Sequence, residues 1–350
     1  MNERFHPLAL GEILDRTAQI YRARFLRFLG VSVVPTLVLL LFLAAGVAAG
    51  AVLNAFAGNR PLSGAQDVTL GVIVVLLGLV GVPAFLGAMA LSWAALTDAA
   101  AATFLGGSFT IREVYGRAWK RRWSMLWLLI MDFLLAGAIP GLIGIAIAAV
   151  SAALGALADK SGMSVLSMVI AGAMFVLIGA VAVLSMWLLL RLCLGFAVCV
   201  VEPASAWQSL KRSSVLGKGT RGRMFVLLLL GYALETGLAL GLFFVLVIAI
   251  ALIPGSQGAK NRDAFSAAIA FGFYGLSFVV QALVRPVYGI GLTLFYFDQR
   301  IRKEGFDIEW MMRGAGMEAL PATPGTEPLA QAEVSPWLTL PEEPTGGSES

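Results

Sequence analysis

The segment that decides the fold runs from residue 163 to residue 201 and reads MSVLSMVIAGAMFVLIGAVAVLSMWLLLRLCLGFAVCVV. Its one charged residue is Arg191. A helix needs about 20 apolar residues to cross the hydrocarbon core of a bilayer, and this run exceeds that length. Two crossings and a turn would need more than about 40 residues. The segment therefore predicts a single transmembrane helix.

Five further apolar runs of the same kind accompany this one. The six runs occupy residues 31–57, 68–105, 123–157, 163–201, 224–254 and 265–297. Apolar residues make up 59% of the chain and charged residues 13%, against about 25% charged residues in soluble domains. We therefore expect an all-α, polytopic membrane protein with six transmembrane helices.

The runs also carry signals for helix bending and helix packing. Proline inside a long helix is a natural kink site, and glycines four residues apart allow helices to approach closely. The prolines are Pro35, Pro83, Pro140 and Pro286, and the glycine pairs are Gly46 with Gly50, Gly137 with Gly141 and Gly237 with Gly241. We expect kinks at the prolines and tight helix packing at the glycines.

The segments that connect the runs alternate in charge. Residues 1–30, 106–122, 202–223 and 298–313 hold 19 of the 25 Lys and Arg residues, whereas the other three connecting segments hold four. Short basic loops remain in the cytoplasm. We therefore expect both termini on the cytoplasmic face.

The basic segments also predict helices that lie along the membrane surface. In residues 1–30, Leu10 and Ile13 fall on an apolar helical face and Arg16 on a charged one. A capping-box pattern opens a second amphipathic stretch near 108–122, and a third, weaker one occupies 203–216. The stretches begin about 95–100 residues apart, which indicates a repeated unit. We expect three hairpins, each preceded by a cytoplasmic interfacial helix.

These patterns divide the chain into three regions. Residues 1–30 form the first interfacial helix, and residues 31–313 form the six-span membrane domain. Residues 314–350 contain six prolines and six glutamates without a Lys or Arg. That composition is typical of disordered segments, so we expect an acidic, Pro-rich, disordered tail.

Cations on the interfacial helices are candidates for contact with anionic lipid headgroups. They are Arg16, Arg22, Arg117, Lys120, Arg121, Lys211 and Arg212. The expected partners are the lipid bilayer, its anionic headgroups and, as a further option, another membrane protein. The net charge of only +4 gives no support to nucleic-acid binding.

Five charged residues, Asp98, Asp132, Arg191, Glu235 and Arg285, lie inside predicted spans, where ionisable side chains are costly and face the bundle interior. Counted from the cytoplasmic ends at about 1.5 Å per residue, Asp132, Arg191, Glu235 and Arg285 lie at depths of roughly 14–20 Å. We predict that Asp132 pairs with Arg191 and Glu235 with Arg285, unless the hairpins exchange partners. Such buried charge pairs either hold helices together or line a proton or anion path.

Motifs for catalysis or metal binding are missing. His6 is the one histidine, and Cys193 and Cys199 lie in one apolar run without CxxC spacing. No phosphate-binding loop or HExxH pattern occurs, and the outer turns are too short for a catalytic domain. We expect no enzyme activity, no catalytic residue, no metal site and no cofactor.

Three stretches carry a family resemblance: PLALGEILDRT at 7–17 followed by IYR at 20–22, VEP at 201–203 with SLKRS at 209–213 and GKG at 217–219, and FYFDQRIRKEGFDIE at 295–309. Together they resemble a bacterial family of multi-pass proteins related to the membrane domain of glycerophosphoryl diester phosphodiesterase. In the namesake enzymes a separate metal-dependent barrel domain performs the hydrolysis. This sequence lacks that domain, so the resemblance implies a place in the bacterial cytoplasmic (inner) membrane without phosphodiesterase activity.

Two functions follow from these patterns. The first is a non-enzymatic integral membrane protein that organises or binds lipids or partner proteins through its basic cytoplasmic face. The alternative is a small-solute or ion transporter or channel that uses a charged mid-membrane core. A cavity at membrane depth lined by the buried charges would favour transport, whereas a packed core below a basic face would favour the first function.

Overall fold

The computed structural model describes residues 7–56, 64–160, 164–202, 204–252 and 262–314. Within these ranges the chain is helical, with turns and no strand. Six stretches are long and apolar enough to cross a membrane: Phe25–Leu53, Val68–Phe104, Arg122–Leu157, Ser167–Val201, Arg221–Ala251 and Gly275–Glu304. The predicted all-α class and the six stretches capable of spanning are thus confirmed. His6 and, apart from Gly314, the predicted acidic tail lie outside the described residues.

Pairs of long helices alternate along the chain with one or more short helices. The long ones are α2 (Phe25–Phe56), α3 (Gly64–Phe104), α6 (Ile139–Lys160), α7 (Ser164–Leu192), α10 (Arg221–Ala251) and α11 (Arg262–Glu304). The short ones are α1 (Leu10–Ala23), α4 (Ile111–Lys120), α5 (Arg122–Asp132), α8 (Gly195–Val201), α9 (Ala206–Leu216) and α12 (Phe306–Gly314), and a π-helical turn, Phe133–Ala138, joins α5 to α6.

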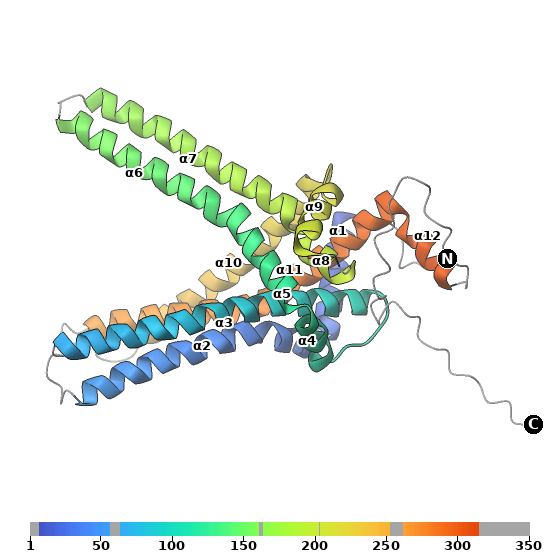
Figure 1. Cartoon of the computed structure of the whole chain (residues 1–350), viewed down its shortest axis with the longest axis horizontal. Coiled ribbons are helices and arrows are strands. Elements are labelled where there is room, and N and C mark those ends of the chain that lie inside the picture. The colour runs from blue at the N-terminus through green and yellow to red at the C-terminus, as the bar shows by residue number, and fades with distance from the viewer. Residues whose placement is uncertain (1–6, 57–63, 161–163, 203, 253–261, 315–350) are drawn as a thin grey trace, which may run out of the picture.

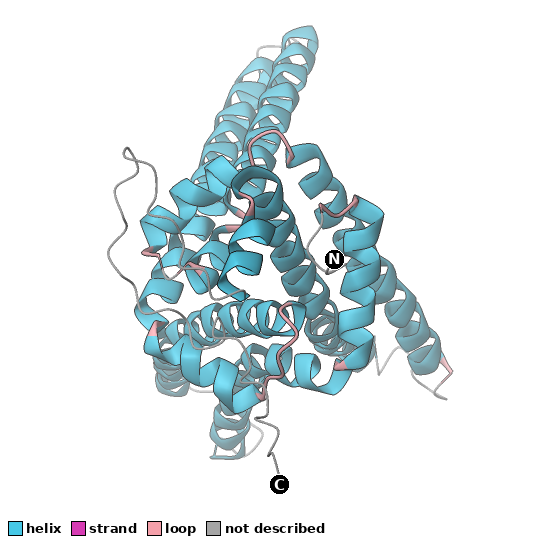
Figure 2. Cartoon of the chain, turned by 90° about the vertical axis from the view of Figure 1, so that its right-hand side faces the viewer, coloured by secondary structure: helices cyan, strands magenta, loops and turns pink. Residues whose placement is uncertain are grey.

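The long helices pack as consecutive partners, and the short helices gather at one end of the molecule. Helix α2 lies along α3, α6 along α7, and α10 along α11. The pair α6 and α7 diverges from the other two (Figure 1). Figure 2 looks onto the end where α1, α4, α8, α9 and α12 lie together, which we call the short-helix layer. Between helices that diverge, the apolar side chains remain exposed, as expected of surfaces that face lipid.

Helix α11 is the centre of the assembly. In its apolar window 61% of the residues are buried, against 0–11% in the other five candidate spans. Close backbone approaches surround it: a Cβ at Gly231 would lie 2.5 Å from Cε1 of Tyr288, and a Cβ at Gly289 would lie 3.2 Å from Cβ of Leu96. These glycines therefore allow α10 and α3 to pack tightly against α11.

The glycine pairs that the sequence indicated are not the tight contacts. Nothing lies within 4 Å of a Cβ built at Gly141, Gly237 or Gly241, and the neighbours of Gly46 and Gly50 are at ordinary contact distance. The predicted packing role is therefore not found at Gly141, Gly237 and Gly241, whereas Gly46 and Gly50 contact leucines of α3. With 39 glycines in the chain, spacing alone does not tell which of them face another helix.

Prolines inside the spans produce a bonding pattern that links the helices. Proline has no backbone N–H, so the carbonyl four residues before it loses its helical donor. Before Pro140, the freed carbonyl of Ala136 accepts a hydrogen bond from the hydroxyl of Ser185 on α7. This proline directly follows the π-helical turn, where the predicted kink falls between α5 and α6 (Figure 1).

At two other prolines, too, a hydroxyl group from a neighbouring helix replaces the missing backbone donor. Pro286 frees the carbonyl of Ala282, which accepts from the hydroxyl of Ser32 on α2. Pro35 frees the carbonyl of Val31, which accepts from Ser92 on α3 at 3.1 Å and from Tyr115 on α4 at 2.7 Å. A carbonyl without a partner is costly in an apolar medium, and donors from neighbouring helices remove that cost. The prolines thus join α6 to α7, α11 to α2, and α2 to α3 and α4.

Two ion-pair clusters hold the short-helix layer together. In the first, the fully buried Asp298 accepts from the backbone N–H of Leu8 at 2.8 Å, from Nε of Arg302 at 2.8 Å and from Nη1 of Arg223 at 3.3 Å. Both arginines also donate to the carbonyl oxygen of Leu8. This Asp298 cluster fixes the start of α1 to the start of α10 and to the end of α11.

The second cluster centres on Glu202. Its carboxylate pairs with Arg212 on α9 and accepts from the hydroxyl of Tyr296 at 2.8 Å. Arg212 also lies 2.9 Å from Glu304. Burial by itself would lower the pKa of Arg212. The hydrogen bond and charge of Glu202 and the charge of Glu304 outweigh this effect, so the pKa of Arg212 lies above its ordinary value. The Glu202 cluster thereby positions α9 against the end of α11.

Candidate functional site

A pocket of about 220 Å³ lies where the end of α7 meets α9. Helix α9 begins at a capping box that sequence inspection missed: the Ser205 hydroxyl accepts from the backbone N–H of Gln208, whose side chain accepts from the N–H of Ser205. The residues that line the pocket are Leu135, Leu188, Arg191, Leu192, Trp207, Leu210, Lys211 and Ser214. It is therefore an apolar slot with two cations at its wall.

The cations at this position have no carboxylate partner. Among the described residues, no ion pair involves Arg191, Lys211 or the nearby Arg221, and the buried Nε of Arg221 makes no hydrogen bond. The guanidinium groups of Arg191 and Arg221 instead lie 5.3 Å and 5.1 Å from the ring centroid of Trp187. Contact with an aromatic face stabilises a cation but leaves its charge uncompensated. The site can therefore accept an anion.

The predicted pairing of Asp132 with Arg191 is wrong, because no ion pair joins these two described residues. On α7, Leu188 and Arg191 line the basic pocket, whereas Leu189 faces a separate cavity of about 270 Å³ that contains Asp132. Arg191 and Asp132 therefore lie toward different faces of α7. Matched depths along two helices do not place two side chains on facing sides.

The predicted pairing of Glu235 with Arg285 also fails to form within ion-pair distance in the described structure. The hydroxyl of Tyr288 donates to Glu235 at 3.4 Å, and Nη1 of the buried Arg285 reaches the carbonyl oxygen of Ser32 at 3.5 Å. Both charged groups have a polar neighbour, but neither has the other as its direct partner.

Four of the seven cations predicted to contact headgroups are used inside the molecule. Arg16 lies 2.9 Å from Glu12, and Arg117 lies 2.7 Å from Asp98. Arg121 donates to two backbone carbonyl groups that lead into α9, and Arg212 belongs to the Glu202 cluster. Each of these four side chains therefore has a partner inside the protein, and contact with a lipid headgroup is not needed to account for its position.

The other three cations, Arg22, Lys120 and Lys211, are exposed. In the described part of the chain their side-chain nitrogens have no hydrogen-bonding or ion-pair partner. Lys211 alone of these lines a pocket, the basic one at α9. Nearby on α4 and α5, Trp119 and Trp123 are more than half exposed, and Arg122 lies over both rings. Exposed tryptophan and free cations at one level are typical of a membrane interface.

The residues of the most specific sequence motif hold the helices of the short-helix layer together. In residues 295–309, Asp298 and Arg302 form the Asp298 cluster, and Tyr296 and Glu304 take part in the Glu202 cluster. The sequence identified this motif but gave no hint of its partner, since Leu8 and Asp298 are 290 residues apart.

Comparisons with protein-family models, with curated proteins and with solved structures gave no match to this chain. Among the described residues, no group of three or more His, Cys, Asp and Glu side chains is placed to hold a metal ion. The site is therefore defined by its own chemistry: cations and tryptophan beside an apolar slot.

Proposed function

We propose that this chain is a non-enzymatic integral membrane protein that binds anionic lipids at its cytoplasmic face. In this proposal, the six candidate spans form three hairpins, and α1, α4 and α9 are interfacial helices whose apolar sides face the acyl chains. The membrane is the cytoplasmic (inner) membrane of a bacterium, with both termini inside. The relation to the membrane domain of glycerophosphoryl diester phosphodiesterase stays a prediction carried by the three sequence motifs.

The observation that carries the proposal is the basic pocket between α7 and α9. Arg191 and Lys211 supply charge, Trp207 is exposed beside them, and leucines complete an apolar wall. A phosphate group suits the planar guanidinium of arginine, and an acyl chain suits the leucines. A lipid with a negative headgroup satisfies both requirements at once.

The charge pattern supports the orientation. The described parts of the basic connecting segments lie in the short-helix layer (Figure 1), and the inner leaflet of a bacterial membrane attracts basic segments near its surface. Each Lys or Arg near such a surface contributes about 1 kcal/mol of binding free energy. Two pocket cations therefore supply about 2 kcal/mol, or roughly 30-fold in affinity.

The test uses the full chain purified in a neutral detergent. Phosphatidylglycerol and phosphatidylcholine with identical acyl chains are titrated in, and bound lipid is counted by native mass spectrometry. We expect phosphatidylglycerol to bind more tightly, and this preference to weaken as salt rises. Lys211→Gln should lower its affinity about fivefold, and Arg191→Gln combined with Lys211→Gln roughly 30-fold.

The matched control is Lys260→Gln, in a segment that the charge pattern assigns to the opposite face. It removes one lysine as well but should leave the preference for phosphatidylglycerol unchanged. Equal binding of the two lipids, or equal loss in the control and the pocket variants, would contradict the proposal.

The transport alternative has one observation in its favour, namely the cavity that contains Asp132. Of the four predicted core charges it contains only this one, and Arg191 lines a different pocket. A continuous charged path through the membrane therefore has no support from these contacts, whereas a binding site around Asp132 does.

A further inference from the structure

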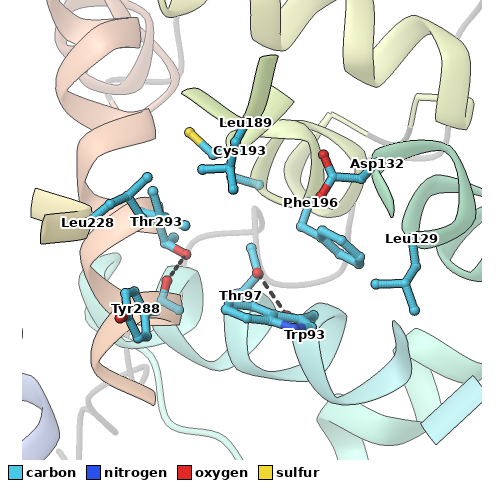
Figure 3. Close-up of a pocket in the computed structure, with 13 residues that line it drawn as sticks. Trp93, Thr97, Leu129, Asp132, Leu189, Cys193, Phe196, Leu228, Tyr288 and Thr293 are labelled. Atoms are coloured by element: carbon cyan, nitrogen blue, oxygen red, sulfur yellow. Dashed lines mark hydrogen bonds between the residues drawn. The ribbon is translucent and has the colours of Figure 1, made fainter. Parts of the chain in front are cut away.

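Asp132 lies in a cavity that the lipid-binding proposal does not use. The cavity measures about 270 Å³ and is formed by α3, α5, α7, α8, α10 and α11 near the short-helix layer. Its lining is mostly apolar and includes Trp93, Thr97, Asp132, Phe196, Tyr288 and Thr293 (Figure 3). It is therefore an apolar, partly aromatic space with a single carboxyl group.

The carboxyl group of Asp132 has an unmet bonding requirement. Its Oδ1 atom is buried and has no hydrogen-bond partner. Asp132 ends α5 within the candidate span Arg122–Leu157. An acidic side chain at membrane depth is costly unless a cation or a donor compensates it, and such residues mark binding or transport sites. In the described structure no Lys or Arg pairs with it.

The hydroxyl and thiol groups that line the cavity already donate their hydrogens to other groups of the protein. The hydroxyl of Thr97 donates to the carbonyl of Trp93 at 2.9 Å, and that of Thr293 to the carbonyl of Gly289 at 2.7 Å (Figure 3). The thiol of Cys193 and the hydroxyl of Tyr288 also donate to partners away from Asp132. Apart from the indole N–H of Trp93, these side chains can therefore only accept hydrogen bonds from a ligand.

Two aromatic rings line the same cavity as the carboxyl group. They belong to Phe196 and Trp93 (Figure 3), and their ring centroids are 6.3 Å apart. Aromatic faces attract cations, and tryptophan does so most strongly. A carboxylate, hydroxyl acceptors and aromatic faces together select a ligand with a positive charge and hydrogens to donate.

We infer that this cavity binds a small organic ammonium ion with an apolar body. The ammonium group lies at Asp132, and the apolar body contacts Trp93, Phe196 and the surrounding leucines. Ligand pockets in proteins usually measure about 300–1,000 Å³, so a cavity of this size suits a small amine. A bare divalent ion fits poorly, because it would need about six oxygen ligands.

The experiment measures binding to the full chain purified in a neutral detergent. The probes are phenethylammonium and phenethyl alcohol, which share their shape but differ in charge at neutral pH. Equilibrium dialysis against protein-free micelles corrects for partition into detergent. We expect the ammonium ion to bind at least about tenfold more tightly than the alcohol, because only the ion compensates a desolvated carboxylate.

Variants then locate the site and separate binding from folding. Asp132→Asn should abolish the preference for the ammonium ion without lowering the apparent Tm, since its buried Oδ1 has no hydrogen-bond partner to lose. Glu235→Gln is the matched control, because Glu235 is also an acid within a candidate span but does not line this cavity. It should leave the preference unchanged.

Each possible outcome of this experiment either supports or overturns the inference. Preferential ammonium binding that Asp132→Asn removes and Glu235→Gln retains supports the inference. Equal binding of the two probes would show that the cavity is an apolar slot for neutral molecules or acyl chains. If neither probe binds, the cavity does not bind small organic ammonium ions. A preference that survives in Asp132→Asn would place the cation elsewhere. Any of these three results would overturn the inference.

Discussion

The bond between Ser32 and the carbonyl of Ala282 offers a test of how the prolines link the spans. The fully buried Ser32 donates to this carbonyl, which has lost its helical donor because residue 286 is proline. Ser32→Ala leaves the carbonyl without that partner in a dry environment. An unsatisfied buried group costs about 1–3 kcal/mol. At about 2–4 °C per kcal/mol, the apparent Tm should fall by roughly 2–12 °C.

The cause is isolated by restoring the backbone donor. Pro286→Ala supplies an N–H four residues after Ala282, so Ser32→Ala should cost almost nothing in that background. The resulting double-mutant cycle should show a coupling free energy of about 1–3 kcal/mol. The assay is thermal unfolding of the purified protein in one detergent, followed by circular dichroism and repeated at several heating rates.

A matched control is available on α9. Ser209 is also fully buried, but the carbonyl to which its hydroxyl donates, that of Ser205, also accepts the backbone N–H of Ser209. Ser209→Ala should therefore cost less than Ser32→Ala. If Ser32→Ala and Pro286→Ala are additive within about 0.5 kcal/mol, the hydroxyl does not replace the missing donor and the reasoning is wrong.

Three further predictions test other contacts. Asp298→Asn removes the charge of a fully buried carboxylate that faces two arginines, so it should cost about 3 kcal/mol and increase hydrogen exchange in α1; unchanged exchange would show that this cluster does not hold α1. Gly231→Ala should lower the apparent Tm because its Cβ meets Tyr288, whereas Gly237→Ala meets open space and should not; equal effects would contradict the packing. Burial raises the pKa of Tyr115 to about 12, so its contribution to stability should be complete below the ordinary phenol pKa of about 10 and lost as the pH rises toward 12. Absorbance titration of the protein and its Tyr115→Phe variant should differ by one phenol that ionises near pH 12, and a difference near pH 10 would refute the burial argument.

The spans could be predicted from the sequence because the solvent permits few alternatives. Backbone polar groups in lipid must be satisfied internally, so a long apolar run such as 163–201 has to be helical. One local signal was also identified correctly: the capping box of Thr110 and Glu113 is present at the start of α4, although that of Ser205 and Gln208 at the start of α9 was missed. Hydropathy and capping depend on neighbours in the sequence, which is why both could be read from it.

The candidate site depended on information that the sequence does not contain. Depth along a helix follows from counting residues, but the side of the helix that faces a given neighbour depends on how the helices pack. Arg191 therefore lies at a suitable depth for Asp132 but lines a different pocket. Lys211 is exposed, so its predicted contact with headgroups stays a prediction, whereas Arg121, predicted for the same role, donates to the chain that leads into α9.

The orientation of the short-helix layer can be measured directly, and the proposed lipid binding depends on it. Green fluorescent protein and alkaline phosphatase are fused separately after Ser350 of the full chain and expressed in a bacterial host. The charge pattern predicts a cytoplasmic C-terminus. The fluorescent fusion should therefore be bright and the phosphatase fusion inactive. An active phosphatase fusion with a dark fluorescent fusion would place the C-terminus outside and contradict the assignment of the basic layer to the inner face.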